Sequence, residues 1–342
     1  MNRIAIGVDL GGTNLRIAGV DEQGALLEKI TLGTKVSLGR DHVIGEMCDA
    51  IQRISEKYKN SAPLLGIGIG IPGFIDMQTG LLRDAPNLPG WVDYPVRAEI
   101  ERRLQTIVIL ENDANVAALG EKWLGAAKDF SDMAMITLGT GVGGGLVQDG
   151  VVWRGANGMA GEWGHATVEP EGHPCGCGNR GCLEQCASAT AIVRMAREAI
   201  ASNGASALAH AASSDPEFSA KSIYNLAIQG DEDACRIFRY VGRCLGIMLS
   251  TLVNSLNLPI YVIGGGAAGA WDAFSPSMFE ELQQRSVVYA LTAPRESLSK
   301  QGASAHAKPG PGPKTIITRA LLGSDAGLYG AARLPMIAAA KR

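Results

Sequence analysis

The 342-residue chain lacks the features that mark membrane, secreted and nucleic-acid-binding proteins. No apolar run approaches the roughly 18 to 20 residues that cross a bilayer, and residues 1–10 read as a strand carrying Asp9, not as a signal peptide. Lysine and arginine form no run and the net charge is −3, which argues against a nucleic-acid surface. We therefore expect a cytoplasmic protein with no membrane or nucleic-acid partner.

Charged residues are also few, at 19% of the chain against 46% hydrophobic residues. This balance excludes a disordered chain and is typical of a globular protein with well-filled cores. The length fits two domains of ordinary size.

Cysteine is sparse outside one glycine-rich segment. Cys175, Cys177 and Cys182 fall within eight positions, and His165 lies ten residues before the first of them. The odd number of cysteines, seven in all, argues against a disulfide framework. Three thiolates and an imidazole are instead the ligand set of a closed tetrahedral zinc site. His173 is a rival nitrogen ligand, two residues before Cys175.

Glu162 and Glu184 bracket this cluster, which a purely structural zinc site does not require. The segment therefore suggests a metal that holds polar side chains around a small molecule. The other cysteines follow apolar helical patterns and are expected in the core: Cys48, Cys186, Cys235 and Cys244. The remaining histidines are expected on the surface: His42, His210 and His306.

Strand and helix patterns alternate along the chain, which predicts an α/β protein with two mixed sheets and flanking helices. A hairpin with a glycine turn, followed by a helix and a strand, occurs twice, so we expect two lobes with a ligand cleft between them. Strands are expected at 4–10, 15–20, from 26, 64–71, 106–110, 133–137, 144–147 and 260–263. Helices are expected at 41–58, 115–124, 187–203, 231–254 and from about 325, with a loop or disordered insertion at 296–314.

Three glycine-rich turns follow predicted strands, at residues 9–14, 138–145 and 264–266. Glycine lets a backbone approach an anion and point its amide hydrogens at it. Thr13 adds a hydroxyl donor, and Asp9 could hold a hydrated magnesium ion. Neither of the first two turns matches a P-loop or a Rossmann fingerprint, and a tight hairpin alone also selects glycine. Together, the three turns favour phosphate binding.

Polar residues cluster where an apolar strand is expected to meet a helix, at Glu111, Asn112, Asp113 and Asn115. Asp113 could simply cap the helix, but ligands also bind at such strand ends. A carboxylate there could accept a proton from a hydroxyl that attacks phosphorus. The turn-rich segment 86–91 has a plain surface loop as its alternative interpretation.

Taken together, these motifs resemble the ROK family, which contains sugar kinases and sugar-responsive repressors of the actin-like ATPase superfamily. The resemblance runs from residues 9–13 to 322–327, and its most specific part joins 161–165 to 175–184. It looks most like the glucokinase branch. It implies a two-lobed, ribonuclease H-like fold, with a small lobe at 1–115 plus 318–342 and a large lobe at 116–317 that contains the zinc site.

The resemblance also implies roles for individual residues, with Asp113 as the general base for the sugar 6-hydroxyl. The implied contacts to the sugar are Gly73, Asn87, Asn112, Asp113, Glu162, His165 and Glu184. The implied zinc ligands are His165, Cys175, Cys177 and Cys182. The implied nucleotide contacts are Asp9, Gly11, Gly12, Thr13, Asn14, Thr140, Gly141, Gly143, Gly144, Gly265 and Gly266.

The activity so implied is phosphorylation of glucose by Mg-ATP, in a homodimer or homotetramer with structural zinc. Many relatives have lysine where this chain has Asn14, and the segment 296–314 is long for the family. Alternatives are a kinase for N-acetylmannosamine or fructose, polyphosphate or another nucleotide as donor, and a bare sugar-binding module. A sugar-responsive repressor is a further alternative, but those relatives carry a winged-helix module for which a first strand at Ile4 leaves no room.

Overall fold

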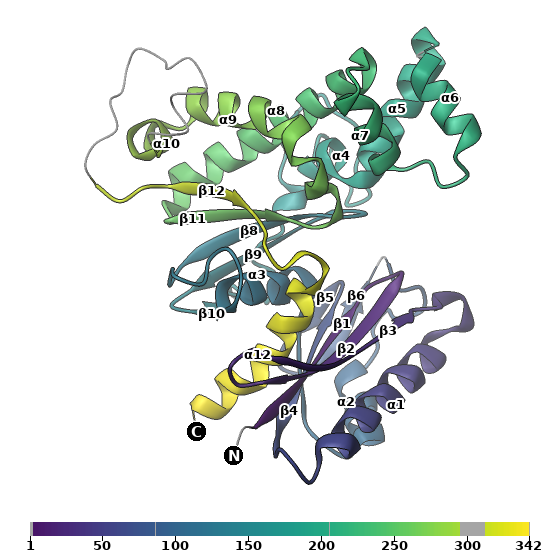
Figure 1. Ribbon diagram of the computed structural model, residues 1–342, viewed down its shortest axis with the longest axis vertical. Coiled ribbons are helices and arrows are strands. Elements are labelled where there is room, and N and C mark those ends of the chain that lie inside the picture. The colour runs from purple at the N-terminus through teal and green to yellow at the C-terminus, as the bar shows by residue number, and fades with distance from the viewer. Residues whose placement is uncertain (1–2, 86, 205, 295–311, 342) are drawn as a thin grey trace. The chain divides into compact units, whose positions relative to one another are not determined.

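The computed structural model describes residues 3–85, 87–204, 206–294 and 312–341 (Figure 1). Most of the predicted insertion at 296–314, together with His306 and Pro86, lies outside the described residues. None of the described helices is both long enough and apolar enough to cross a membrane.

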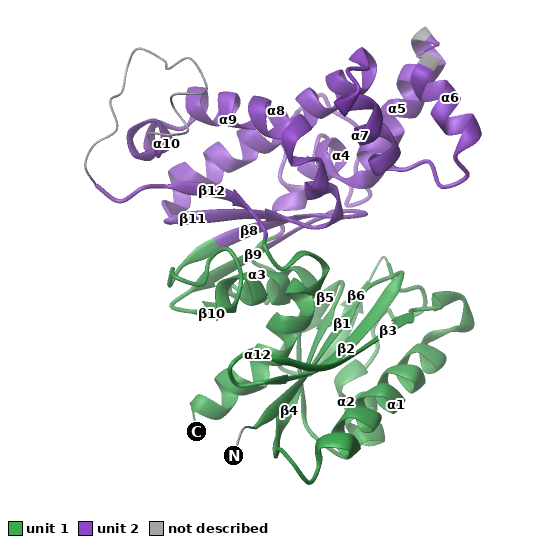
Figure 2. Ribbon diagram, in the orientation of Figure 1, with its two compact units in different colours: residues 1–133, 145–161, 321–342 green, residues 134–144, 162–320 purple. Residues whose placement is uncertain are grey.

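The chain forms two compact units (Figure 2). Unit 1 contains Met1–Met133, Gly145–Gly161 and Leu321–Arg342, and unit 2 contains Ala134–Gly144 and Glu162–Ala320. This division differs from the predicted lobes, because residues 116–133 and 145–161 group with unit 1 and residues 318–320 with unit 2. The predicted boundary at 115 would cut helix α3 (Asp113–Trp123), which packs along α12 (Ala326–Ala340) of the same unit.

Unit 1 is built on a five-stranded sheet of order β3-β2-β1-β4-β7. Its strands are β1 (Ile4–Leu10), β2 (Asn14–Asp21), β3 (Leu26–Gly33), β4 (Leu64–Ile71) and β7 (Val108–Asn112). The first three strands pair antiparallel, whereas β1, β4 and β7 run parallel. The carboxyl ends of these parallel strands lie at one edge of the sheet. The end of β7 and the turn after β1, which carry the polar residues that the sequence singled out, are both at this edge.

Helices cover both faces of this sheet. Ile6, Val8 and Leu10 of β1 belong to a core shared with helices α1 (Arg40–Tyr58) and α2 (Val96–Leu104). Ala5, with the opposite alternation, packs against α12. A side chain at Gly7 would clash with this helix, since its Cβ would lie 2.3 Å from the Leu328 carbonyl oxygen. Glycine in β1 thus permits the helix to approach the sheet closely.

The second sheet has the order β10-β9-β8-β11-β12, with β8, β11 and β12 parallel. Its strands are β8 (Met133–Leu138), β9 (Val142–Gln148), β10 (Val151–Val152), β11 (Ile260–Gly264) and β12 (Ile316–Arg319). The division between the units passes through β9. Unit 2 contains helices α4 (Leu183–Ala187), α5 (Ala189–Asn203), α6 (Ser206–Ser214), α7 (Ala220–Ile228), α8 (Glu232–Leu256), α9 (Trp271–Arg285) and α10 (Val287–Thr292).

The remaining elements are short. A hairpin joins β5 (Phe74–Asp76) to β6 (Leu81–Asp84), and 3₁₀ turns occur at η1 (Val36–Leu38), η2 (Trp163–His165), η3 (Gly266–Ala270) and η4 (Gly323–Asp325).

The predicted strands 4–10 and 64–71 have the observed bounds, and the other predicted elements are found within a few residues of their ends. The sequence did not predict β5, β6, β10, β12, α2, α4, α6, α7, α9 or α10. His42 lies at the surface as predicted, with 36% of its side chain exposed, but it does have a partner, since its Nε2 lies 3.4 Å from Glu46 Oε2 on the next turn of α1. Cys48, Cys186 and Cys244 are buried as expected, whereas Cys235 is only half-buried.

Candidate functional site

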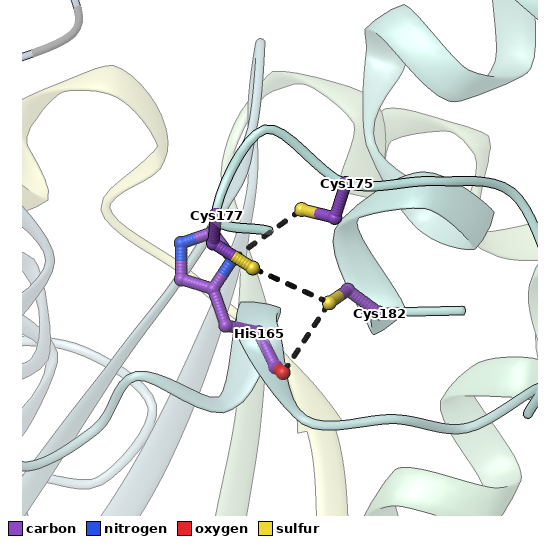
Figure 3. Close-up of side chains that lie close together, drawn as sticks. All are labelled: His165, Cys175, Cys177 and Cys182. Carbon is purple, nitrogen blue, oxygen red and sulfur yellow. Dashed lines mark hydrogen bonds between the residues drawn. The ribbon is translucent and has the colours of Figure 1, made fainter. Parts of the chain in front are cut away.

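The predicted metal ligands converge in unit 2 (Figure 3). The ligand atoms of His165, Cys175, Cys177 and Cys182 all lie within 4.8 Å of one another. Cys175 Sγ is 3.7 Å from His165 Nδ1, and Cys177 Sγ is 3.8 Å from Cys182 Sγ. Tetrahedral zinc with Zn–S bonds of about 2.3 Å separates its sulfur ligands by about 3.8 Å. The cluster therefore fits a metal ion of this kind.

Tight turns fold the cysteine loop onto the histidine. Cys175 N donates to Asn179 O at 2.8 Å, and Gly178 and Gly181 have φ angles of 90° and 66°, which favour glycine. Cys182 is the N-cap residue of α4. The rival ligand His173 is not part of the cluster, and its Nδ1 lies 3.0 Å from the Pro174 carbonyl oxygen.

The charge balance of the cluster also favours a cation. Burial, and then the neighbouring thiols, raise the pKa of Cys182 to about 12. The pKa of the exposed Cys177 is lowered, chiefly by a backbone hydrogen bond from Asn179. A bound cation would supply the positive charge that three adjacent thiolates need.

The predicted sugar contacts of unit 2 lie beside this cluster. Glu184 is the second residue of α4, two positions after Cys182, and Glu162 is the N-cap of the 3₁₀ turn that carries His165. The pKa of Glu162 is raised by desolvation of its carboxyl group, lowered by His165 and raised again by the charge of Glu184. Glu162, His165 and Glu184 therefore share one electrostatic environment.

The predicted sugar contacts of unit 1 gather at the end of β7. Asn112 is the N-cap of α3, since its Oδ1 accepts from the backbone N–H groups of Ala114 and Asn115 at 2.9 and 3.3 Å. This result corrects the alternative that Asp113 caps the helix. Asp113 Oδ1 instead accepts from Ala114 N at 2.9 Å, and Asn112 Nδ2 donates to the Gly73 carbonyl oxygen at 3.3 Å.

Asn87 lies on a loop whose other residues anchor it. Leu88 and Trp91 are buried, at about 1% exposure each, whereas Asn87 is exposed. A Cβ at Gly12 would lie 3.2 Å from the Asn87 carbonyl oxygen, so this loop lies against the first glycine turn. Segment 87–91 is therefore more than a plain surface loop.

The first glycine turn carries a paired carboxylate. Asp9 Oδ2 lies 3.3 Å from Arg16 Nη1, directly across the β1–β2 hairpin. Burial raises the pKa of Asp9, Arg16 lowers it, and the nearby Asp325 raises it again. Gly11, Gly12 and Thr13 form the turn between these two strands, and Asn14 is the first residue of β2.

The second glycine turn, residues 139–141 between β8 and β9, is held by the segment that follows the cysteine cluster. Ala189 N donates to Gly139 O at 2.9 Å, and Thr190 Oγ1 donates to Thr140 O at 2.7 Å. The predicted contacts Thr140 and Gly141 lie on this turn, whereas Gly143 and Gly144 lie in β9. The third turn is also crowded, because a Cβ at Gly265 would lie 2.4 Å from the Leu138 carbonyl oxygen. Gly266 follows it and begins η3.

The sequence did not predict two ion pairs beside the candidate site. Arg16 was not identified as the partner of Asp9, although both face one side of a predicted hairpin. Glu111 was grouped with the ligand-facing residues, but it is buried and paired with Arg154 at 2.6 Å. The sequence indicated the buried ion pair of Glu111 only by placing a charged residue at the end of an apolar strand.

Comparison with known proteins agrees with this arrangement. The model of the ROK family matches residues 5–336. The glucokinase of Halalkalibacterium halodurans is 40% identical over 292 residues, which cover 85% of this chain and 87% of that protein. The glucokinase of Thermotoga maritima is 40% identical over 286 residues, or 84% of this chain and 88% of that protein.

Among solved structures, a ROK family glucokinase from Streptomyces griseus in complex with glucose and AMPPNP has a TM-score of 0.77 at 32% identity. The match covers 97% of this chain and 98% of that one. The fold is thus the two-lobed actin-like ATPase fold of sugar kinases. The chain belongs to the ROK family.

Proposed function

We propose that this protein is a glucokinase, which transfers the γ-phosphoryl group of ATP to the 6-hydroxyl of glucose. One observation carries the proposal. Asn112 and Asp113 stand together at the carboxyl end of β7, in a chain that is 40% identical to two glucokinases over most of its length.

Asp113 is the proposed general base. A primary alcohol is a poor nucleophile at neutral pH, but it need not ionise beforehand. The carboxylate only has to accept the proton while the oxygen–phosphorus bond forms. Asp113 is the first residue of α3, and its Oδ1 accepts a hydrogen bond from Ala114 N. These two features fix the orientation of its side chain.

The other proposed sugar contacts form hydrogen bonds with the remaining hydroxyl groups. Carboxylates accept hydrogen bonds from such groups, and amides both accept and donate them. His165 presents Nδ1 to the cysteines, so its Nε2 is the nitrogen proposed to face the sugar. Zinc bound to the cluster would fix the orientation of this ring. The proposed contacts in unit 1 are Gly73, Asn87, Asn112 and Asp113, and those in unit 2 are Glu162, His165 and Glu184.

Backbone amides of the glycine turns are proposed to hold the nucleotide phosphates. Asp9 would hold Mg²⁺ through water, and the ion would neutralise charge on the phosphates. Thr13 and Thr140 add hydroxyl donors on the first and second turns, and Gly265 and Gly266 are proposed to lie near the adenosine. Arg16, the partner of Asp9, is the cation nearest to this carboxylate.

A coupled assay over a panel of acceptors and donors tests the proposal. Glucose, fructose, mannose and N-acetylmannosamine are compared as acceptors with ATP, and ATP, other nucleotides and polyphosphate are then compared as donors with glucose. We expect the highest kcat/KM for the pair of glucose and ATP. A higher value for N-acetylmannosamine or fructose, or for polyphosphate, would contradict it. The predicted homodimer or homotetramer is tested separately by sedimentation.

A further inference from the structure

A buried carboxylate lies directly behind the proposed sugar site of unit 1. Glu111 is 1% exposed, and its Oε2 accepts from Arg154 Nε at 2.6 Å. Its Oε1 accepts from the backbone N–H of Asn112 and from Asn115 Nδ2, both at 3.0 Å. Both oxygens of this carboxylate are therefore engaged, one by a cation and the other by amides.

The hydrogen bonds of Glu111 lead to the side chains that the proposed function uses. Glu111 Oε1 accepts a hydrogen bond from the backbone N–H of Asn112. The side chain of Asn112 caps α3, and its Nδ2 donates to the Gly73 carbonyl oxygen at 3.3 Å. Asp113 is the next residue, and Asn115 is one turn further along the helix. The orientation of the proposed base and of its neighbour thus depends on where the Glu111 carboxylate lies.

Arg154 holds that carboxylate from a segment distant in sequence. It lies 43 residues after Glu111, just beyond β10, and its carbonyl oxygen accepts from Ala160 N at 3.1 Å. This contact closes the loop that ends at Gly161, immediately before Glu162. Arg154 is therefore fixed by its backbone on one side and by Glu111 on the other.

The two partners differ in exposure, which makes their roles unequal. The side chain of Arg154 is 38% exposed and can be hydrated if it loses its partner, whereas that of Glu111 is 1% exposed and cannot. Removing one member of a buried ion pair is costly when the remaining charge stays buried. Loss of Arg154 should therefore disturb the site more than loss of the charge on Glu111.

We propose that Arg154 and Glu111 are positioning residues for the phosphoryl transfer. The pair holds the β7–α3 junction so that Asn112 and Asp113 present their side chains to the sugar. This inference rests on the proposed function, because it assigns those two side chains to glucose.

The test compares Arg154→Met, Glu111→Gln and the double variant with the wild-type protein. Glucose affinity is measured by calorimetry without nucleotide, and KM and kcat are measured in the coupled assay. We expect Arg154→Met to weaken glucose binding by about tenfold and to lower kcat. Glu111→Gln keeps an acceptor for Asn112 N, so it should change affinity by less than about threefold. The double variant should be as impaired as Arg154→Met, since the side chain at position 111 then has no cation to hold it in place.

Arg53→Met is the matched control, because Arg53 is 73% exposed and lies 3.9 Å from Glu28 on the same unit. A purely structural role would lower the melting temperature and the fraction of active protein while leaving KM for glucose unchanged. Arg154→Lys, which keeps the charge, serves if Arg154→Met does not fold, and it should then bind glucose more weakly than wild type.

The outcomes separate the two proposals. If the wild-type protein binds no glucose and phosphorylates no hexose, both the proposed function and this inference are wrong. If the wild-type protein is active but folded Arg154→Met keeps wild-type glucose affinity and kcat, only the positioning role is overturned. The same holds if the double variant recovers wild-type glucose affinity, because the defect of Arg154→Met would then come only from an unpaired buried charge.

Discussion

The carboxylate of Glu184 accepts a hydrogen bond from the backbone N–H of Val142, with 3.0 Å between Oε2 and the nitrogen. Val142 is the first residue of β9, directly after the second glycine turn, and a Cβ at Gly141 would lie 2.3 Å from the same carboxylate oxygen, so a side chain there would displace this carboxylate. A side chain proposed to bind glucose therefore also supports a turn proposed to bind phosphate. Both belong to unit 2.

This shared role predicts different results for two substitutions of Glu184. Glutamine can still accept from Val142 N but binds sugar hydroxyls less strongly than a carboxylate. We expect Glu184→Gln to raise KM for glucose by about tenfold while changing KM for ATP by less than about twofold. Glu184→Ala should raise both constants. Initial-rate kinetics with each substrate varied provide the measurement, and an unchanged KM for ATP in Glu184→Ala would contradict a role in the turn.

Replacing the proposed base should separate binding from turnover. Asp113→Asn keeps the size of the side chain and an oxygen that can accept from Ala114 N, but it removes the group that takes the proton. We expect kcat to fall by about 10²- to 10⁴-fold, with glucose affinity within about threefold of wild type. Calorimetry of glucose binding and the coupled assay measure the two quantities. Near-normal turnover would remove Asp113 from the base role.

The metal cluster was predictable because its four ligands lie within eighteen positions and have distinctive chemistry. The strand at 64–71 was predictable for a similar reason, since apolar residues and a following Pro72–Gly73 pair mark it locally. Helix α2 was not predictable, because among its nine residues only Val96 and Ile100 are buried. The sequence of α2 therefore shows little of the apolar periodicity from which a helix is predicted.

Contacts between distant segments could not be predicted in the same way. The ion pair of Glu111 and Arg154 joins residues 43 positions apart, and nothing local to either one names the other. The N-cap at α3 was assigned to the wrong residue in the alternative interpretation, because Asn112 and Asp113 are both good capping residues. The hydrogen bonds that Asn112 Oδ1 accepts from Ala114 N and Asn115 N, together with the extended backbone of Asn112 (φ of −65° and ψ of 146°), distinguish them.

Removing the cluster's metal should weaken glucose binding. We expect about one zinc ion per subunit in the purified protein, and its loss in Cys182→Ser, since Cys182 is fully buried beside His165. Because His165 is a ligand and Glu184 follows Cys182 by two residues, glucose affinity should fall with the metal. Cys235→Ala is the control and should retain zinc, since this cysteine lies outside the cluster. Metal analysis and calorimetry measure both effects; zinc-free protein with full glucose affinity would end this assignment.

The pair of Asp9 and Arg16 predicts a pH dependence for nucleotide use. Burial raises the pKa of Asp9 and Arg16 lowers it, with Asp325, itself paired with Lys29, raising it again. Protons should therefore compete with Mg²⁺ for Asp9 as the pH falls, and KM for Mg-ATP should rise. In Arg16→Met the lowering influence is lost, so this rise should begin at a higher pH than in wild type. Kinetics across the acid range measure it.

The control for this profile is Arg53→Met, which leaves the neighbours of Asp9 in place and should keep the wild-type pH dependence. An Arg16→Met profile that coincides with the wild-type profile would show that Arg16 does not govern the titration of Asp9.

The close contact of α3 with α12 predicts a large loss of stability from a single methyl group. A Cβ at Gly330 would lie 1.7 Å from the Val116 carbonyl oxygen, so the two helices would have to separate. We expect Gly330→Ala to lower the free energy of unfolding by about 3 kcal/mol, because overpacking of a rigid backbone contact is destabilising. The matched control is Gly45→Ala in α1, where the nearest atom, Arg103 Nη1, would be 3.6 Å away. That change should raise the free energy of unfolding by about 0.5 to 1 kcal/mol, because alanine favours a helix over glycine. Urea unfolding of both variants provides the measurement, and equal stabilities would contradict the close packing of α3 on α12.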